Sequence, residues 1–158
     1  MTADDLPVEE ADNPTAHTVR SWLGLLVVIL FVIQVSASGW AYAEWYHTRT
    51  GNVHDMQVLW HRFAVAMGNS MVAMITLAGG TGLILNARWA WRTVATAAVL
   101  QILVTVATQL WEGLMPVPEG YPPERGLMGA LIGIVAWNII PVAVLTLSVA
   151  GRPRAARS

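Results

Sequence analysis

The apolar residues of this chain are concentrated in four long segments, with short polar segments between them and at both ends. The apolar segments cover about residues 21–45, 57–86, 91–111 and 126–150. Each reaches the ~20 residues of helix that cross a hydrocarbon core of ~30 Å. Lipid offers no hydrogen-bond partner to the backbone, so segments of this kind must be helical. The pattern therefore predicts an all-α fold, an integral membrane four-helix up-down bundle.

Composition agrees with this interpretation. Apolar residues make up 55% of the 158 residues and charged residues only 12%, whereas soluble domains carry about 25% charged residues. The net charge of −1 gives no reason to expect nucleic acid as a partner, so the expected partner is the lipid bilayer. The absence of Cys excludes disulfides and thiolate metal sites.

The charged residues predict how the bundle is oriented. We expect residues 1–19 to be a disordered acidic cytoplasmic tail, residues 20–151 the transmembrane domain, and residues 152–158 a basic cytoplasmic tail. Arginines favour the cytoplasmic side of a membrane. Six would lie there and three outside: Arg20, Arg88, Arg92, Arg152, Arg154 and Arg157 against Arg49, Arg62 and Arg125. This predicts a multi-pass protein of the cytoplasmic membrane with both termini in the cytoplasm.

Small residues indicate where helices approach one another. Glycine and alanine pairs spaced by four allow close contact of membrane helices. Gly39 and Ala43 offer such a surface on the first segment, and Ala78 and Gly82 offer one on the second. In the fourth segment Gly129 and Gly133 form a GxxxG motif. This motif predicts a contact inside the bundle or one with a second copy or a partner membrane subunit.

Each segment also carries an amide side chain at membrane depth. Counting ~1.5 Å per residue places Gln34 level with Asn69, and Gln101 level with Asn138. We therefore expect two polar layers, which either clamp the helices together or line a binding cavity.

The third segment carries a polar stripe. Gln101, Thr105, Thr108 and Glu112 recur at spacings of four, three and four, which places them on one helical face. This face is expected to point inward and to form either a vestibule open to the outer side or a helix contact.

His61 opens the second segment and is the candidate for cofactor chemistry. Gly68 lies on the same helical face, where it would make room for a flat ring, so His61 could be an axial haem ligand. The alternative is an interfacial histidine bonded to a loop carbonyl or a headgroup. The neighbouring Arg62 is expected to reach headgroups or to pair with Glu112. The outer His, Asp and Glu residues match no compact metal motif, so no metal site is predicted.

The positions of Gln34, His61-Arg62, Gln101 and Asn138 resemble a family of small four-helix bacterial membrane proteins of unknown function. The resemblance implies a four-helix bundle and, through the paired histidines of that family, a haem-like site. This chain departs from the pattern at Val65, where the family has an early Gly, and at Val135, where it has the second His.

These observations predict a non-catalytic protein, either an accessory or interaction subunit or a small-ligand-binding bundle. Two alternatives from other classes remain. One is a haem- or quinone-associated redox subunit that uses His61, and the other is a small transporter or metal-handling protein that uses the stripe on the third segment.

The orientation is testable because the chain has no native Cys. In Ser158→Cys and Glu119→Cys variants, a membrane-impermeant maleimide added to intact cells should label position 119 only. Position 158 should react after permeabilisation. Labelling of both positions from one side would contradict four crossings.

Overall fold

The computed structural model describes residues 14–51, 56–85, 87, 89–114 and 126–150. Four helices account for nearly all of them: α1 Pro14–Thr50, α2 Met56–Ile84, α3 Ala90–Leu114 and α4 Gly126–Ala150. No strand occurs in these ranges. Each helix is long and apolar enough to cross a membrane. The expected all-helical class with four such helices is confirmed.

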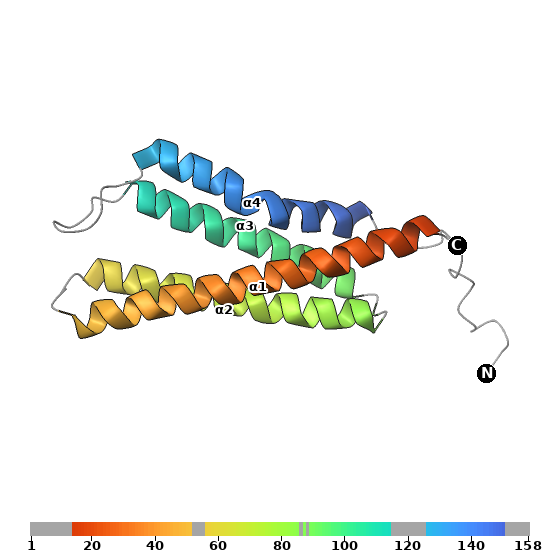
Figure 1. Ribbon diagram of the computed structural model, residues 1–158, viewed down its shortest axis with the longest axis horizontal. Helices are drawn as coiled ribbons and strands as arrows, with labels where there is room; N and C mark the ends of the chain where they lie inside the picture. Colours follow the sequence, from red (N-terminus) through yellow and green to blue (C-terminus); the bar gives the residue numbers. More distant parts are fainter. Residues whose placement is uncertain (1–13, 52–55, 86, 88, 115–125, 151–158) are drawn as a thin grey trace.

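Successive helices run in opposite directions and form two close pairs, α1 with α2 and α3 with α4 (Figure 1). The pairs join mainly through α2 and α3, while α1 and α4 share only a small contact. We call the end where α1 leads into α2 and α3 leads into α4 the distal end, on the left of Figure 1. The opposite end is the proximal end, where α1 comes close to α4.

The first helix is longer than the sequence predicts. It begins at Pro14 and ends at Thr50, rather than at about residues 21 and 45. Residues 14–19, which we expected in a disordered tail, are therefore helical; residues 1–13 and 152–158 lie outside the described residues. Hydropathy marks only the part of a helix that suits lipid, and a helix can continue where its side chains are polar. At the distal end, the Thr48 and Thr50 hydroxyls donate to the carbonyls of Glu44 and Tyr46 within the last turns.

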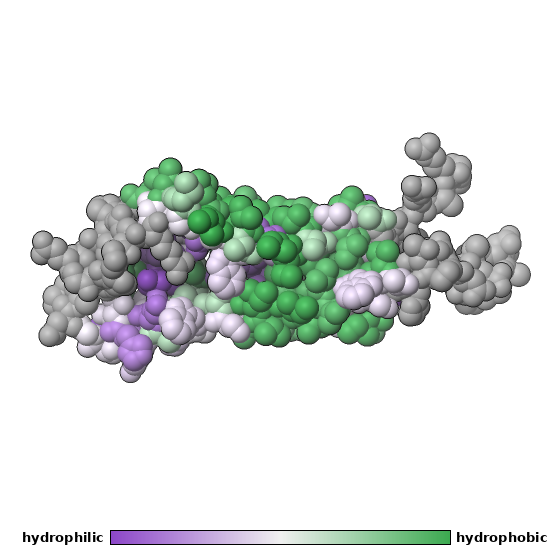
Figure 2. All heavy atoms as spheres, turned by 45° about the horizontal axis from the view of Figure 1, so that its top comes forward, coloured by the Kyte–Doolittle hydropathy of each residue, from purple (hydrophilic) through white to green (hydrophobic). Residues whose placement is uncertain are grey.

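The outer surface of the bundle is apolar. Large side chains point outward from every helix, for example Val28, Met71, Leu103 and Ile132, which are 58–64% exposed. Figure 2 shows a broad hydrophobic surface along the helices and hydrophilic residues gathered at the distal end. Contiguous apolar surface of this extent is rare on soluble monomers, and lipid is the environment that suits it.

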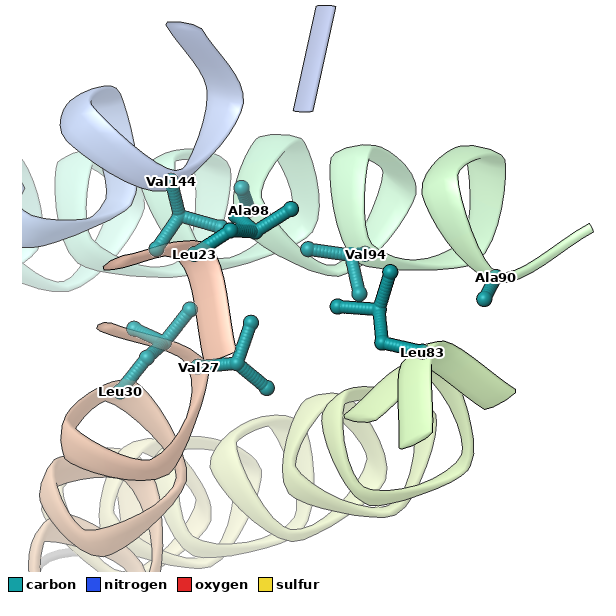
Figure 3. Close-up of a cluster of buried hydrophobic side chains, with 8 residues drawn as sticks. All are labelled: Leu23, Val27, Leu30, Leu83, Ala90, Val94, Ala98 and Val144. Atoms are coloured by element: carbon teal, nitrogen blue, oxygen red, sulfur yellow. The ribbon is translucent and has the colours of Figure 1, made fainter. Parts of the chain in front are cut away.

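The core lies in the proximal half, where all four helices meet. Its members are small or branched apolar side chains (Figure 3): Leu23, Val27, Leu30, Leu83, Ala90, Val94, Ala98 and Val144. Alanines on α3 keep that helix thin enough to lie close to α2 and α4 at once.

Glycines set the spacing between α2 and α3. A Cβ on Gly79 would lie 2.7 Å from Val94 Cγ2 and 3.1 Å from the Val94 backbone nitrogen. A Cβ on Gly82 would lie 2.9 Å from the Cβ of Ala90. Gly82 of the second segment therefore lies at a helix contact as expected, whereas Ala78 is exposed. The expectation for the first segment is wrong, because Gly39 and Ala43 are exposed and nothing lies within 4 Å of a Cβ on Gly39.

Replacing Gly79 should destabilise the bundle, since a side chain there must displace the backbone of α3. We expect Gly79→Val to lower the free energy of unfolding by at least ~1–3 kcal/mol, the usual cost of overpacking. Gly39→Val is the matched control and should change it little. The measurement is reversible unfolding in mixed micelles, and equal effects of the two variants would refute the packing described here.

Candidate functional site

A charged cluster lies at the distal end, between α1, α2 and α3. The Nη1 atom of Arg62 lies 2.6 Å from Glu44 Oε2 and 3.8 Å from Glu112 Oε1. The same Glu112 oxygen lies 3.9 Å from Nε2 of His61. Arg62 was expected to reach headgroups or Glu112; its nearest carboxylate is instead that of Glu44. Glu44 and Glu112 are the only carboxylates among the described residues, and both belong to this cluster.

His61 is held by an aromatic neighbour. Its ring stacks on that of Trp111 with 5.2 Å between the centroids and 7° between the planes. The His61 side chain is only 12% exposed, and its Nε2 atom is buried with no hydrogen-bond partner. The imidazole therefore faces the Glu112 carboxylate across a short gap rather than a loop carbonyl.

The arrangement does not fit the haem that the sequence and the resemblance suggested. The space beside Gly68 is filled by Val104 of α3, whose methyl carbons would lie 3.6 and 3.7 Å from a Cβ at that position. Trp111 covers the His61 ring. Among the described side chains the other imidazole is His47, which is exposed. A porphyrin would need a flat gap next to His61, and α3 occupies that position.

The described residues do not form a metal site either. They contain no group of three or more His, Cys, Asp or Glu side chains that could hold a metal ion. His54 and Asp55, which the sequence also places on the outer side, lie outside the described residues.

The interior amides lie below the cluster. Gln101 Nε2 donates to Asn69 Oδ1 at 3.2 Å and lies 3.3 Å from Thr105 Oγ1. Asn69 Nδ2 donates to the Val65 carbonyl of its own helix. The expected pairing of Gln34 with Asn69 and of Gln101 with Asn138 is therefore wrong, since Asn69 bonds to Gln101.

The register of the helices explains this pairing. Gly68 of α2 lies against Val104 of α3. The backbone of Gln101 is about three residues, or ~4.5 Å, along α3 from that level. The length of a glutamine side chain covers this difference. Counting residues from the end of each apolar segment cannot detect it, because that count ignores how the helices are shifted along one another.

Gln34 and Asn138 remain buried, with polar atoms that lack a partner. Gln34 is fully buried, and neither its Nε2 nor its Oε1 has a hydrogen-bond partner. Asn138 donates to the Ile134 carbonyl, which leaves its Oδ1 without one. These groups are costly in an apolar interior.

The stripe on α3 divides into two parts. Gln101 and Thr105 belong to the interior amides, whereas Glu112 belongs to the distal cluster. Thr108 is half-buried between them. The stripe faces inward as expected, and it links the cluster to the amides along one helix.

Sequence reasoning missed Gln109 and the polar contact between α1 and α2. Gln109 is 8% exposed, and a Cβ on Gly133 would overlap its side-chain amide. Gly133 therefore serves a contact inside the bundle, which is one of the two alternatives that the sequence left open for this motif. The signal was present, because Gln101, Thr105 and Gln109 follow a spacing of four. On α1, the Ser38 hydroxyl lies 2.6 Å from that of Ser70.

Comparison of the chain with models of protein families, with curated proteins and with solved structures finds no match. The resemblance noted from the sequence therefore stays a prediction.

The Asn69–Gln101 bond should couple the two residues energetically. In a double-mutant cycle of Asn69→Leu and Gln101→Leu, we expect a coupling of ~0.6–1.7 kcal/mol, the range for side-chain bonds between membrane helices. A cycle of Thr76→Val with Gln101→Leu is the control, because the Thr76 hydroxyl bonds to Val72 of its own helix. Its coupling should be near zero. Similar coupling in both cycles would contradict the bond.

Proposed function

We propose that this chain is a multi-pass protein of the cytoplasmic membrane, with both termini inside, which is non-catalytic and binds a small organic cation at its distal, outward-facing end. The apolar outer surface and the four long helices support the membrane placement. The arginine distribution supports the orientation. Of the two non-catalytic roles that the sequence predicts, ligand binding has the more specific support.

The observation that carries the proposal is the grouping of charged side chains in the distal cluster. Both carboxylates of the described residues, Glu44 and Glu112, lie there beside Arg62 and His61. Their side chains are only 33% and 34% exposed. A cation that reaches these carboxylates is therefore held more strongly than at an open surface in water.

The surroundings of Glu112 indicate the kind of ligand. Arg62 lies 2.6 Å from Glu44 but 3.8 Å from Glu112. Trp111 precedes Glu112 in the chain and is 39% exposed. A carboxylate next to an aromatic ring is a combination that suits amines and quaternary ammonium groups. A metal ion is less suited, since the described residues offer no set of three ligands.

The test uses the full chain in lipid nanodiscs, with methylammonium and tetramethylammonium as probes and tryptophan fluorescence as the readout. We expect saturable binding of both probes to the wild type. Glu112→Gln should weaken binding at least about tenfold, since an interaction with a charged group contributes ~1.5–3 kcal/mol. His61→Arg, which places a permanent positive charge beside Glu112, should abolish binding.

His47→Arg is the matched control, because His47 is exposed at the same end and is not part of the cluster. It should bind as the wild type does. Binding that survives both Glu112→Gln and His61→Arg would overturn the proposal, as would the absence of saturable binding to the wild type.

A further inference from the structure

A lateral groove follows the α1–α2 seam in the proximal half of the bundle, far from the distal cluster. It has a volume of about 590 Å³ and is lined by residues of both helices from Arg20 to Phe31 and from Thr76 to Ile84. The helices approach closely beside it, where a Cβ on Gly80 would lie 3.1 Å from Val27 Cγ1. At Gly24 the groove is open, since nothing lies within 4 Å of a Cβ there.

The walls of the groove suit a hydrocarbon chain. Val28, Phe31, Leu77 and Ile84 are among the residues that line it. The Thr76 and Thr81 hydroxyls also line it, but they donate to the carbonyls of Val72 and Leu77 in their own helix. The two threonines therefore add no unsatisfied hydroxyl donor to the walls.

One end of the groove is cationic. Arg20 lines it and donates from Nη2 to the carbonyl of Leu83, in the last turn of α2. This bond fixes the guanidinium at the proximal mouth and uses one of its five N–H donors. Both carboxylates of the described residues lie at the distal end, so within this part of the chain no acidic side chain neutralises Arg20.

The length of the groove matches a lipid that spans one leaflet of the bilayer. Arg20 and Phe31 are eleven residues apart on α1, or ~16 Å. This is about half of the ~30 Å hydrocarbon thickness of a bilayer. Trp22 and Trp89 are more than half exposed at the same end, where exposed tryptophans favour the headgroup level. Arg20 therefore lies where a phosphate would, and the groove extends to where an acyl chain would end.

We propose that this groove is a binding site for an anionic phospholipid of the cytoplasmic leaflet, whose phosphate pairs with Arg20 and whose acyl chain lies over Gly24. The site rests on the proposed membrane placement but not on the cation site, which lies at the other end of the bundle. Anionic lipids are concentrated in that leaflet, which matches the charge of the mouth.

Native mass spectrometry of the full chain, released from detergent with added lipid, tests the site. We expect one phosphatidylglycerol to be retained about fivefold more tightly than phosphatidylcholine, the ratio expected for one arginine near the lipid surface. Arg20→Gln should remove this preference and Arg20→Lys should keep it. Gly24→Leu should fill the groove and reduce retention of both lipids.

Two matched variants control for general effects. Gly39→Leu changes an exposed glycine of the same helix that also has nothing within 4 Å of its Cβ, and it should retain lipid as the wild type does. Arg92→Gln removes an exposed charge from α3 at the same end and should keep the preference. Helicity and elution volume establish that each variant is folded.

The proposal is overturned if wild-type protein retains the two lipids equally, or if Gly24→Leu binds lipid as Gly39→Leu does. A preference that Arg20→Gln and Arg92→Gln reduce equally would also overturn it, since net charge would then be the cause. Glu112→Gln should leave lipid retention unchanged. Failure of the cation site and failure of the lipid site can therefore be told apart.

Discussion

The close approach of α2 and α3 is the contact on which the rest of the structure depends. Gly79 and Gly82 leave room for Val94 and Ala90, and no larger residue fits at either glycine without moving α3. This contact joins the two helix pairs, because α1 and α4 touch only over a short length. Membrane helices gain little from burying apolar surface against each other, so van der Waals contact at small residues must supply the association.

Once this contact is made, the interior polar groups follow from it. The register of α2 against α3 brings Asn69 within reach of Gln101, and the register of α3 against α4 brings Gln109 against Gly133. Threonine and serine hydroxyls find a hydrogen-bond acceptor within one helix, as Thr76 and Ser148 do by donating to carbonyls of their own helices. A short hydroxyl can reach its own backbone, whereas a glutamine such as Gln101 reaches across to another helix.

The bundle separates two kinds of chemistry between its ends. The distal end gathers both described carboxylates, Arg62 and His61 near Trp111. The proximal end has an apolar core, a lateral groove and Arg20. The two proposed ligands are accordingly opposite in charge. They also approach from different phases, the cation from water and the lipid from within the bilayer.

The number and type of the four helices and the approximate bounds of the last three were readable from the sequence, as was the close contact at Gly82. Such features depend on the length and hydropathy of a local segment or on small residues within it. Residues that meet across helices were not readable. The bond of Asn69 to Gln101, the stacking of His61 on Trp111 and the burial of Gly133 against Gln109 depend on how each helix is rotated and shifted against its neighbour. A shift of two or three residues changes every such pair while leaving the hydropathy of each segment the same, so only the tertiary structure decides them.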